Sequence, residues 1–363
     1  SKMTRTASSF PCRSQPCFFP SNLLVPVLPI GTFLHFTHID LLYSPFLLNP
    51  SKEAENVKKR EATGLLFFVS AQMFCPAAGL LVAKLLCDKD KRCMPKNFFI
   101  GYLVLTGITL LWCFTTFFLP FQQVSTGGMV LSIITALVFI SVYLSESNDA
   151  RSAYGLKSKN WKLSVCLLIL FVVLHCVSLL LVILLTATGN VMDALRTCFS
   201  QLFQPAILFL FLYNFHYHFG EEYGWRSYFQ PLLQKKFGIV KGVLLFGVLW
   251  ELWHLPMVIF FFAPWVSMTS PIELVQVILG RLISTTTLGI FIAYAYMRTN
   301  NVWLPVIIHF LHNTIVMFSL MNFASMEAPN GGVEYWHIIF VYVLILMVFF
   351  TPLLFSKVFR SKI

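Results

Sequence analysis

Charged residues are scarce in this chain. Of its 363 residues, 11% are Asp, Glu, Lys or Arg and 57% are hydrophobic. A soluble globular protein carries about 25% charged residues, so this chain has too few to cover a surface that faces water. The shortage excludes an ordinary soluble domain and indicates an integral membrane protein.

Cysteine patterns and the features of a signal peptide are also lacking in the given sequence. The nine cysteines show no paired Cys-x-x-Cys spacing, so neither a disulfide framework nor a zinc knuckle is supported. Cys113, Cys166 and Cys176 lie in apolar stretches, where a thiol behaves as a small hydrophobic group. The first 21 residues lack the basic start and small-residue cleavage site of a signal peptide, and we expect none there.

Long apolar runs are what the chain has instead. Spanning a bilayer takes roughly 20 helical residues, and backbone groups in hydrocarbon must be satisfied within helices or a closed barrel. The runs are continuous rather than alternating, which favours helices. We therefore predict an all-α, polytopic transmembrane bundle of about eight or nine spans. The expected spans lie near 64–86, 97–119, 128–146, 161–187, 195–219, 239–263, 272–297, 302–323 and 336–356.

The domain organisation follows from these spans. Residues 64–356 form one multi-span membrane domain, and 357–363 form a short basic tail. Residues 1–63 remain unassigned. Within them, the apolar stretch 22–48 is interrupted by prolines, and it is interpreted as a tenth span, a re-entrant piece or an interfacial segment.

The net charge of +11 does not indicate nucleic-acid binding, because Lys and Arg concentrate on one set of loops. The opposing loops, 120–127, 188–194, 264–271 and 324–335, contain neither. Lys and Arg mark the cytoplasmic side of membrane proteins, so we expect the basic loops and the C-terminus in the cytoplasm, although the basic segment 51–63 departs from this pattern. The membrane would be the plasma membrane in a prokaryote and the endoplasmic reticulum in a eukaryote. The basic loop and tail residues are Lys89, Lys91, Arg92, Lys96, Arg151, Lys157, Lys159, Lys235, Lys236, Arg298, Lys357, Arg360 and Lys362.

Three segments place ionisable residues in or beside predicted spans, where such residues are costly and usually functional. A carboxylate can accept a proton from water while an imidazole orients that water. A second imidazole and an amide can then donate hydrogen bonds to an oxyanion. Together they suffice for hydrolysis of an amide bond in a wet cavity. The segments are 220–226 with Glu221, Glu222 and Arg226, 250–256 with Glu251 and His254, and 309–313 with His309 and Asn313.

Each feature has a less specific interpretation when it is considered alone. A lone intramembrane histidine such as His175 is usually a packing or hydrogen-bonding residue. Glu222 and Arg226 are four residues apart, which is also the spacing of a simple helix-end salt bridge. Trp250 and Trp253 are expected to pack against neighbours or lipid. The ordered combination of all three segments is what makes the functional interpretation specific.

That ordered combination resembles the CAAX protease and bacteriocin-processing (CPBP, or abortive-infection) family of intramembrane proteases. The resemblance covers about residues 64–325, with the motifs inside 220–313. The sequence of the first motif is similar to that of the prokaryotic members of the family. Phe is common in the family where this chain has Trp250. The matching motifs are Glu221-Glu222-Tyr223-Gly224-Trp225-Arg226, then Trp250 with His254-Leu255-Pro256, then His309-x-x-x-Asn313.

The resemblance implies a peptidase whose site lies within the membrane and opens to the cytoplasm. Glu221 and His254 would activate water, while His309 and Asn313 would stabilise the oxyanion. Glu222 and Arg226 would support the site. The substrate would be a membrane-embedded or lipid-modified peptide, such as a prenylated one, in contact with the lipid bilayer and without nucleic acid.

A bound metal is not favoured as a cofactor. The chain has no His-Glu-x-x-His helix, the usual zinc signature. Zinc remains an alternative, because Glu221, His254 and His309 could supply three ligands and leave an open position for water. A di-iron site would require two Glu-x-x-His helices, and only one is present.

Two non-enzymatic alternatives belong to another class. A transporter should show paired broken helices in two related halves, and none are visible. A non-proteolytic scaffold or a bacteriocin-immunity-type protein with the same fold is harder to separate from a protease, because a fold does not imply an activity.

One further prediction comes from helix depth rather than from the family. Arg281 and Glu251 lie in neighbouring antiparallel spans at depths that differ by about 3 Å at 1.5 Å of rise per residue. The family usually has an uncharged residue where this chain has Glu251. We expect a buried ion pair between them that braces the helix carrying His254. If the span of Arg281 starts later than predicted, that residue instead lies at the membrane interface.

Overall fold

The computed structural model describes residues 71–360, apart from 89–90, 117, 203–205, 260–270, 314–316 and 328–332. The described residues contain helices and no strand, as the sequence predicts. The helix Ala71–Cys87 comes first in this part of the chain. It is followed by α2 (Lys96–Thr115), α3 (Phe121–Ser145), α4 (Asn148–Ala153), α5 (Trp161–Thr186), α6 (Val191–Leu202), α7 (Ala206–Gly224), η2 (Trp225–Phe229), α8 (Gln230–Phe237), α9 (Ile239–Met257), α11 (Pro271–Thr299), α12 (Trp303–Leu311), α13 (Met317–Glu327), α14 (Val333–Phe350), η5 (Thr351–Phe355) and α15 (Lys357–Arg360).

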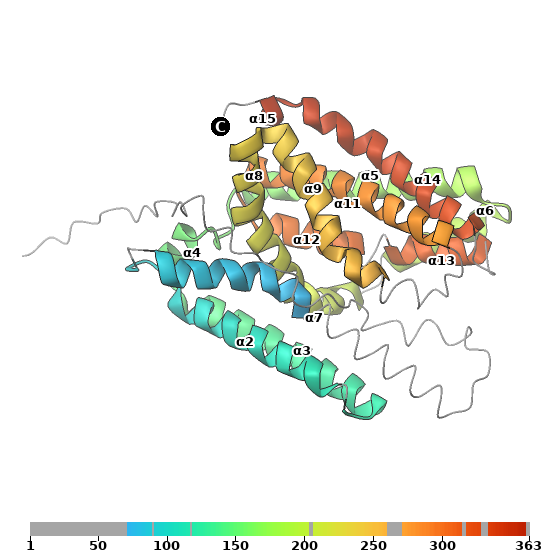
Figure 1. The fold of residues 1–363 in the computed structure, drawn as a ribbon. Coiled ribbons are helices and arrows are strands. Elements are labelled where there is room, and N and C mark those ends of the chain that lie inside the picture. The colour runs from blue at the N-terminus through green and yellow to red at the C-terminus, as the bar shows by residue number, and fades with distance from the viewer. Residues whose placement is uncertain are drawn as a thin grey trace, which may run out of the picture.

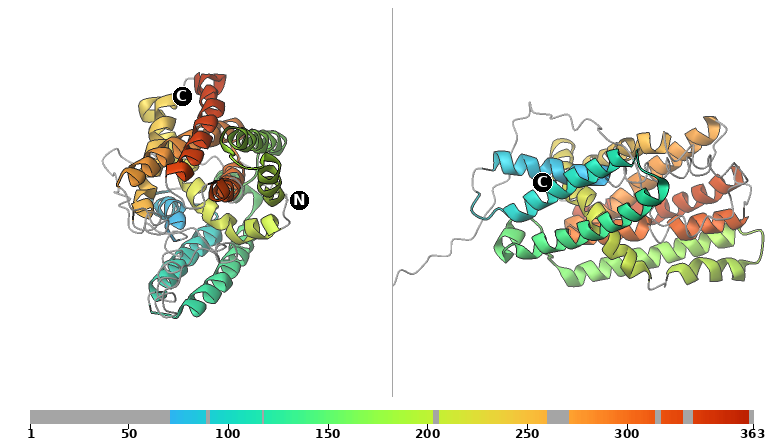
Figure 2. Two further views of the ribbon diagram at one scale, coloured as in Figure 1. Left: turned by 90° about the vertical axis from the view of Figure 1, so that its right-hand side faces the viewer. Right: turned by 90° about the horizontal axis from the view of Figure 1, so that it is seen from below.

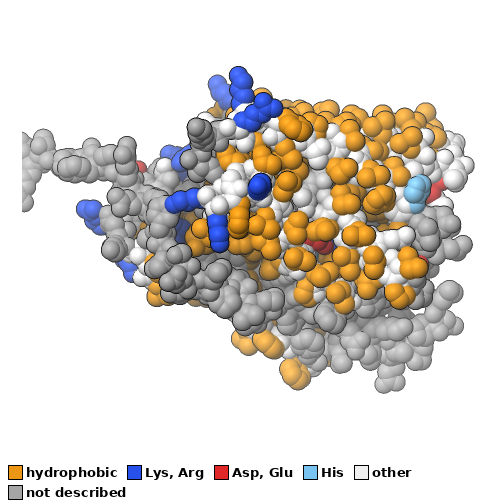
Figure 3. Space-filling view, turned by 45° about the horizontal axis from the view of Figure 1, so that its top comes forward, with side chains coloured by type: hydrophobic (Ala, Val, Ile, Leu, Met, Phe, Trp, Pro, Cys, Tyr) orange, Lys and Arg blue, Asp and Glu red, His pale blue; other side chains and the backbone are white. Residues whose placement is uncertain are grey.

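Six of these helices are long and apolar enough to cross a membrane, which fits an integral multi-pass protein. They run along a shared direction (Figure 2), and hydrophobic side chains cover much of the face in Figure 3, with Lys and Arg gathered towards one end. This is the surface that hydrocarbon requires. The six spans are Lys96–Thr115, Gln122–Ser145, Trp161–Thr186, Ile239–Met257, Pro271–Thr299 and Trp336–Phe355.

Two predicted spans each cover two of the described helices. The span expected over 195–219 covers residues of α6 and α7, and residues 203–205 between them lie outside the described part of the chain. The span expected over 302–323 covers residues of α12 and α13, with residues 314–316 outside the described part. There α12 passes into a π-helical turn at 312–313, and α13 begins at Met317. The N-terminal region 1–63 and its apolar stretch 22–48 lie outside the described residues.

The helices, arranged as in Figure 1, pack around two main hydrophobic clusters of the described residues. One lies among α5, α9, α11 and α14. The other joins the helix Ala71–Cys87 to α2, α3 and α7, with T-shaped contacts of Phe139 to Phe98 and Phe215. The short helix α12 contributes Leu304 and Ile308 to the first cluster and Val306 to the second. The end of α12 is thereby held between the two halves of the bundle.

Glycines allow α7 to approach the helix Ala71–Cys87 closely. Gly220 and Gly224 are four residues apart on α7. A Cβ atom added at Gly220 would clash with the carbonyl oxygen of Met73, and one at Gly224 would clash with the backbone of Pro76. Small residues permit such contact between backbones in membrane helices. The two glycines therefore fix the depth and rotation of the turn that carries Glu221 and Glu222.

We predict that Gly224→Ala destabilises the protein by about 1–3 kcal/mol, because the added methyl group has only rigid backbone beside it. Gly107→Ala on α2 is the matched control, since no heavy atom lies within 4 Å of the added Cβ. Thermal unfolding in detergent should show a lower Tm for the first variant only. Equal effects of both substitutions would contradict this account of the helix contact.

Candidate active site

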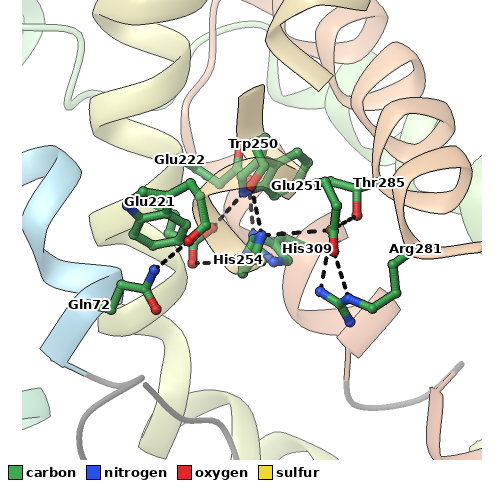
Figure 4. A network of polar contacts seen from close by, with 10 residues as sticks. Gln72, Glu221, Glu222, Trp250, Glu251, His254, Arg281, Thr285 and His309 are labelled. Atoms are coloured by element: carbon green, nitrogen blue, oxygen red, sulfur yellow. Dashed lines mark hydrogen bonds and ion pairs between the residues drawn. The ribbon is translucent and has the colours of Figure 1, made fainter. Parts of the chain in front are cut away.

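The two adjacent glutamates point to different partners at the end of α7 (Figure 4). Both are buried, with exposures of 1% for Glu221 and 0% for Glu222. Successive helical residues are rotated by roughly 100°, so one carboxylate turns towards α9 and the other towards α12. The sequence places the acidic pair at this turn, and the helix geometry separates the roles of its members.

Glu222 lies in a buried ionic cluster. Its Oε2 accepts a hydrogen bond from Nε of Arg226 at 2.7 Å, and its Oε1 lies 2.9 Å from Nδ1 of His309. Arg226 also donates to Oε1 of Gln230 at 2.5 Å, and its guanidinium lies over the ring of Phe246 at 4.5 Å. All of the charge on Glu222 is thus engaged, and the cluster joins α7, η2, α8 and α12.

Glu221 has fewer hydrogen-bond partners than Glu222. Its Oε2 accepts one hydrogen bond, from the indole Nε1 of Trp250 at 3.0 Å. Its Oε1 is buried and has no hydrogen-bond partner among the described residues. That oxygen lies 3.8 Å from Nε2 of His254, too far for a direct hydrogen bond. One carboxylate oxygen therefore faces an imidazole across a gap.

The orientation of His254 is fixed by its own helix. Its Nδ1 lies 2.9 Å from the carbonyl oxygen of Trp250, one turn earlier in α9. A carbonyl only accepts, so we assign the proton to Nδ1, which leaves the lone pair of Nε2 facing Glu221. The side chain of His254 is 14% exposed, compared with 1% for Glu221. The imidazole is therefore the more accessible member of the pair.

The third motif lies at the end of α12. His309 is buried, and its ring meets that of Trp250 at 5.2 Å in a T-shaped contact. Asn313 follows one turn later in the π-helical turn and is half-buried. The structure thus brings His309 into the network of Glu221, Glu222 and His254 and places Asn313 next to it along the chain.

Several polar contacts near the site were not predicted from the sequence. Trp250 does more than pack, since it donates to Glu221, and a buried indole N–H usually has such a partner. Gln72 donates to the carbonyl oxygen of Trp253 at 2.9 Å, and no sequence motif marks it. His175 is buried, and its Nε2 lies 3.4 Å from Nδ1 of His312, a residue within the third motif segment.

The charged residues expected at matching depth lie in contact. Nε of Arg281 donates to Oε1 of Glu251 at 2.7 Å, and its Nη2 lies 3.3 Å from Oε2. The hydroxyl of Thr285 donates to the same Oε2 at 2.6 Å. The side chain of Glu251 is 2% exposed and that of Arg281 is 33% exposed, so the pair bridges α9 and α11 beside the site.

The zinc alternative depends on where the ligand atoms of Glu221, His254 and His309 are directed. Among the described residues, no group of three or more His, Cys, Asp or Glu side chains could hold a metal ion. Nδ1 of His309 is directed at Glu222, and Oε2 of Glu221 is directed at Trp250. Oε1 of Glu221 and Nε2 of His254 nevertheless face each other at 3.8 Å, so zinc held by Glu221, His254 and His309 stays an alternative to the metal-free site.

Comparisons with known proteins agree with the resemblance seen in the sequence. Residues 203–315 match the family model described as type II CAAX prenyl endopeptidase Rce1-like. A protein of Methanococcus maripaludis named CAAX prenyl protease 2 is 28% identical over 236 residues, which cover 60% of this chain and 82% of the relative. The matched region contains all three motifs. These findings do not favour the scaffold alternative.

We predict that Arg226→Gln destabilises the protein by about 3–5 kcal/mol, because the carboxylate of Glu222 would be left buried without its cation. Arg298→Gln is the control, an exposed arginine at the end of α11 whose one hydrogen bond, to the Tyr294 hydroxyl, is long at 3.4 Å. Chemical or thermal unfolding in detergent measures both. A stability of the Arg226 variant equal to that of the control would show that the buried pair is not a structural requirement.

Proposed function

Because the chain belongs to the CAAX protease (CPBP) family of intramembrane endopeptidases, we propose that it cleaves a membrane-embedded or lipid-modified peptide with water activated by Glu221 and His254. The name of the archaeal relative points to a prenylated substrate, in which a cysteine near the C-terminus carries the lipid. The observation that supports this proposal is the unpaired oxygen of Glu221 facing Nε2 of His254 at 3.8 Å.

That separation suits a water molecule bound to both atoms at ordinary hydrogen-bond lengths of about 2.8 Å. As the water oxygen attacks the peptide carbonyl, its proton passes to the Glu221–His254 couple. The new C–O bond makes a tetrahedral oxyanion. The same proton is then donated to the peptide nitrogen as the C–N bond breaks, which releases an amine and a carboxylic acid.

His309 and Asn313 are proposed to stabilise the oxyanion. With its Nδ1–H directed at Glu222, His309 can donate from Nε2 only as an imidazolium. The carboxylate of Glu222, 2.9 Å from Nδ1, orients the ring so that Nε2 lies on the edge away from Glu222. The amide of Asn313 is a neutral donor one turn further along. Arg226 keeps Glu222 ionised and in place, so the two supporting residues act through His309.

The proposed reaction needs no bound metal. Glu221 and His254 together supply the proton acceptor. His309 and Asn313 supply hydrogen bonds to the oxyanion, which serve the purpose that a Lewis acid serves in a metalloprotease. We expect EDTA to leave activity unchanged. Loss of activity with EDTA that zinc restores would overturn the metal-free mechanism.

We also propose that the basic end of the bundle and the C-terminus face the cytoplasm, following the distribution of Lys and Arg. The membrane would be the plasma membrane in a prokaryotic cell. An epitope tag appended after the C-terminal tail should be protected in intact cells and detected after permeabilisation. A tag in the exposed loop 188–190, at the other end of α5, should show the opposite behaviour. The reverse pattern would invert the proposed topology.

We predict that Glu221→Gln and His254→Ala each abolish hydrolysis of a prenylated peptide by protein in liposomes, while the protein stays folded. The double variant should be no worse than either single variant, because the two residues act on one water molecule. Glu273→Gln and His337→Ala, which lie outside the site, are the matched controls. Full activity of either site variant would exclude its proposed role.

A further inference from the structure

The carboxylate of Glu251 is unusually well fixed for a residue outside the three motifs. It is buried and accepts hydrogen bonds from Nε of Arg281 at 2.7 Å, from Nη2 at 3.3 Å and from the hydroxyl of Thr285 at 2.6 Å. Arg281 and Thr285 are four residues apart and so share one face of α11. Three donors on one helix therefore hold an anion on its neighbour (Figure 4).

The same carboxylate lies beside His254. Its Oε2 is 4.0 Å from Nδ1 of the imidazole, and the two residues are three apart on α9. On the opposite edge of the ring, Nε2 is 3.8 Å from Glu221. The imidazole therefore lies between two carboxylates, one on the proposed reacting side and one behind it.

We propose that Glu251 is a positioning residue, which orients His254 and stabilises the imidazolium that forms when His254 accepts a proton from water. This inference rests on the proposed function. A negative charge about 4 Å from Nδ1 attracts the positive charge that develops on the ring during the proposed reaction, and this attraction is stronger in a buried site than in water. The backbone carbonyl of Trp250 fixes the ring direction, and Glu251 adds the charge that a carbonyl lacks.

Arg281 and Thr285 keep that charge available. Burial of an isolated carboxylate is costly because the group loses its hydration. The guanidinium of Arg281 offsets that cost through an ion pair at 2.7 Å, and because the arginine side chain is 33% exposed, part of its own charge remains in contact with the surroundings. In this arrangement α11 supports the reaction, although no residue of α11 is proposed to touch the substrate.

A purely structural brace would show the same contacts, so the test must separate the two roles. Glu251→Gln and Arg281→Gln should each lower the Tm by several degrees, and their double variant should lose less than the sum. Arg298→Gln on α11 is the control for the arginine change. For the positioning role, Glu251→Gln should also lower kcat by about tenfold or more, a part of the effect of a general base, with KM nearly unchanged.

The charge swap Glu251→Arg with Arg281→Glu gives the sharpest separation. It restores an ion pair between α9 and α11, so the Tm should recover in part. It also places a cation beside Nδ1 of His254, so kcat should stay low. Recovery of kcat together with Tm would show that Glu251 is only a brace. Tm losses of the single Gln variants that simply add would show that no pair exists.

Neighbouring threonines provide a milder test that does not depend on the swap folding. Thr285→Val removes the hydroxyl bound to Glu251, whereas Thr286→Val removes a buried hydroxyl with no hydrogen-bond partner among the described residues. We expect Thr285→Val to lower kcat and Thr286→Val to leave it unchanged. Thr285→Ser, which keeps the hydroxyl, should have the wild-type kcat. Equal kcat values in all three variants would overturn the positioning role. If wild-type protein cleaves no peptide, the proposed function fails, while the Tm cycle still reports on the ion pair.

Discussion

The buried contact between Glu222, Arg226 and His309 is the constraint on which the remaining architecture depends. Each charge would be very costly in an apolar bundle if it stood alone, and removing one member of a buried pair strands the other. The contact links α7, the π-helical segment η2 and α12, which belong to different parts of the hydrophobic core. Packing brings these helices together, and the ionic cluster fixes their register.

The role proposed for Glu221 depends on the complete engagement of its neighbour, Glu222. Glu222 has an arginine and a histidine, while Glu221 has one neutral indole donor and a distant imidazole. Two adjacent carboxylates in different environments take different roles, as is common where one must stabilise and the other must exchange protons. The helix turn points the two carboxylates in different directions. The side chains that each one meets on α9 and α12 then determine its environment.

The sequence predicts the all-α membrane architecture and the grouping of the motifs, because the hydrophobic runs are long and the polar residues in them are few. The ion pair of Glu251 and Arg281 could be anticipated from depth alone, since short loops force neighbouring helices to run antiparallel. The hydrogen bond from the Trp250 indole to Glu221 could not be anticipated, because the same indole would pack equally well against lipid. Gln72 was also missed, since its partner is a backbone carbonyl 181 residues away.

The backbone departs from a regular α-helix beside the polar motifs of the site. A continuous helix over 302–323 would satisfy every backbone group internally and would hold its side chains at regular intervals. The structure instead changes to a π-helical turn at 312–313, beside His309, and another π-helical segment covers Trp225–Phe229, after the two glutamates. Such turns are frequent at functional sites, and irregular backbone within a membrane is tolerated only where protein buries it or a wet cavity meets it. A hydropathy window averages over many residues and does not detect such local changes. A span predicted from hydropathy therefore continues through the positions where the chain departs from a regular helix. These two departures lie at polar motifs, where neighbouring side chains rather than lipid surround the backbone.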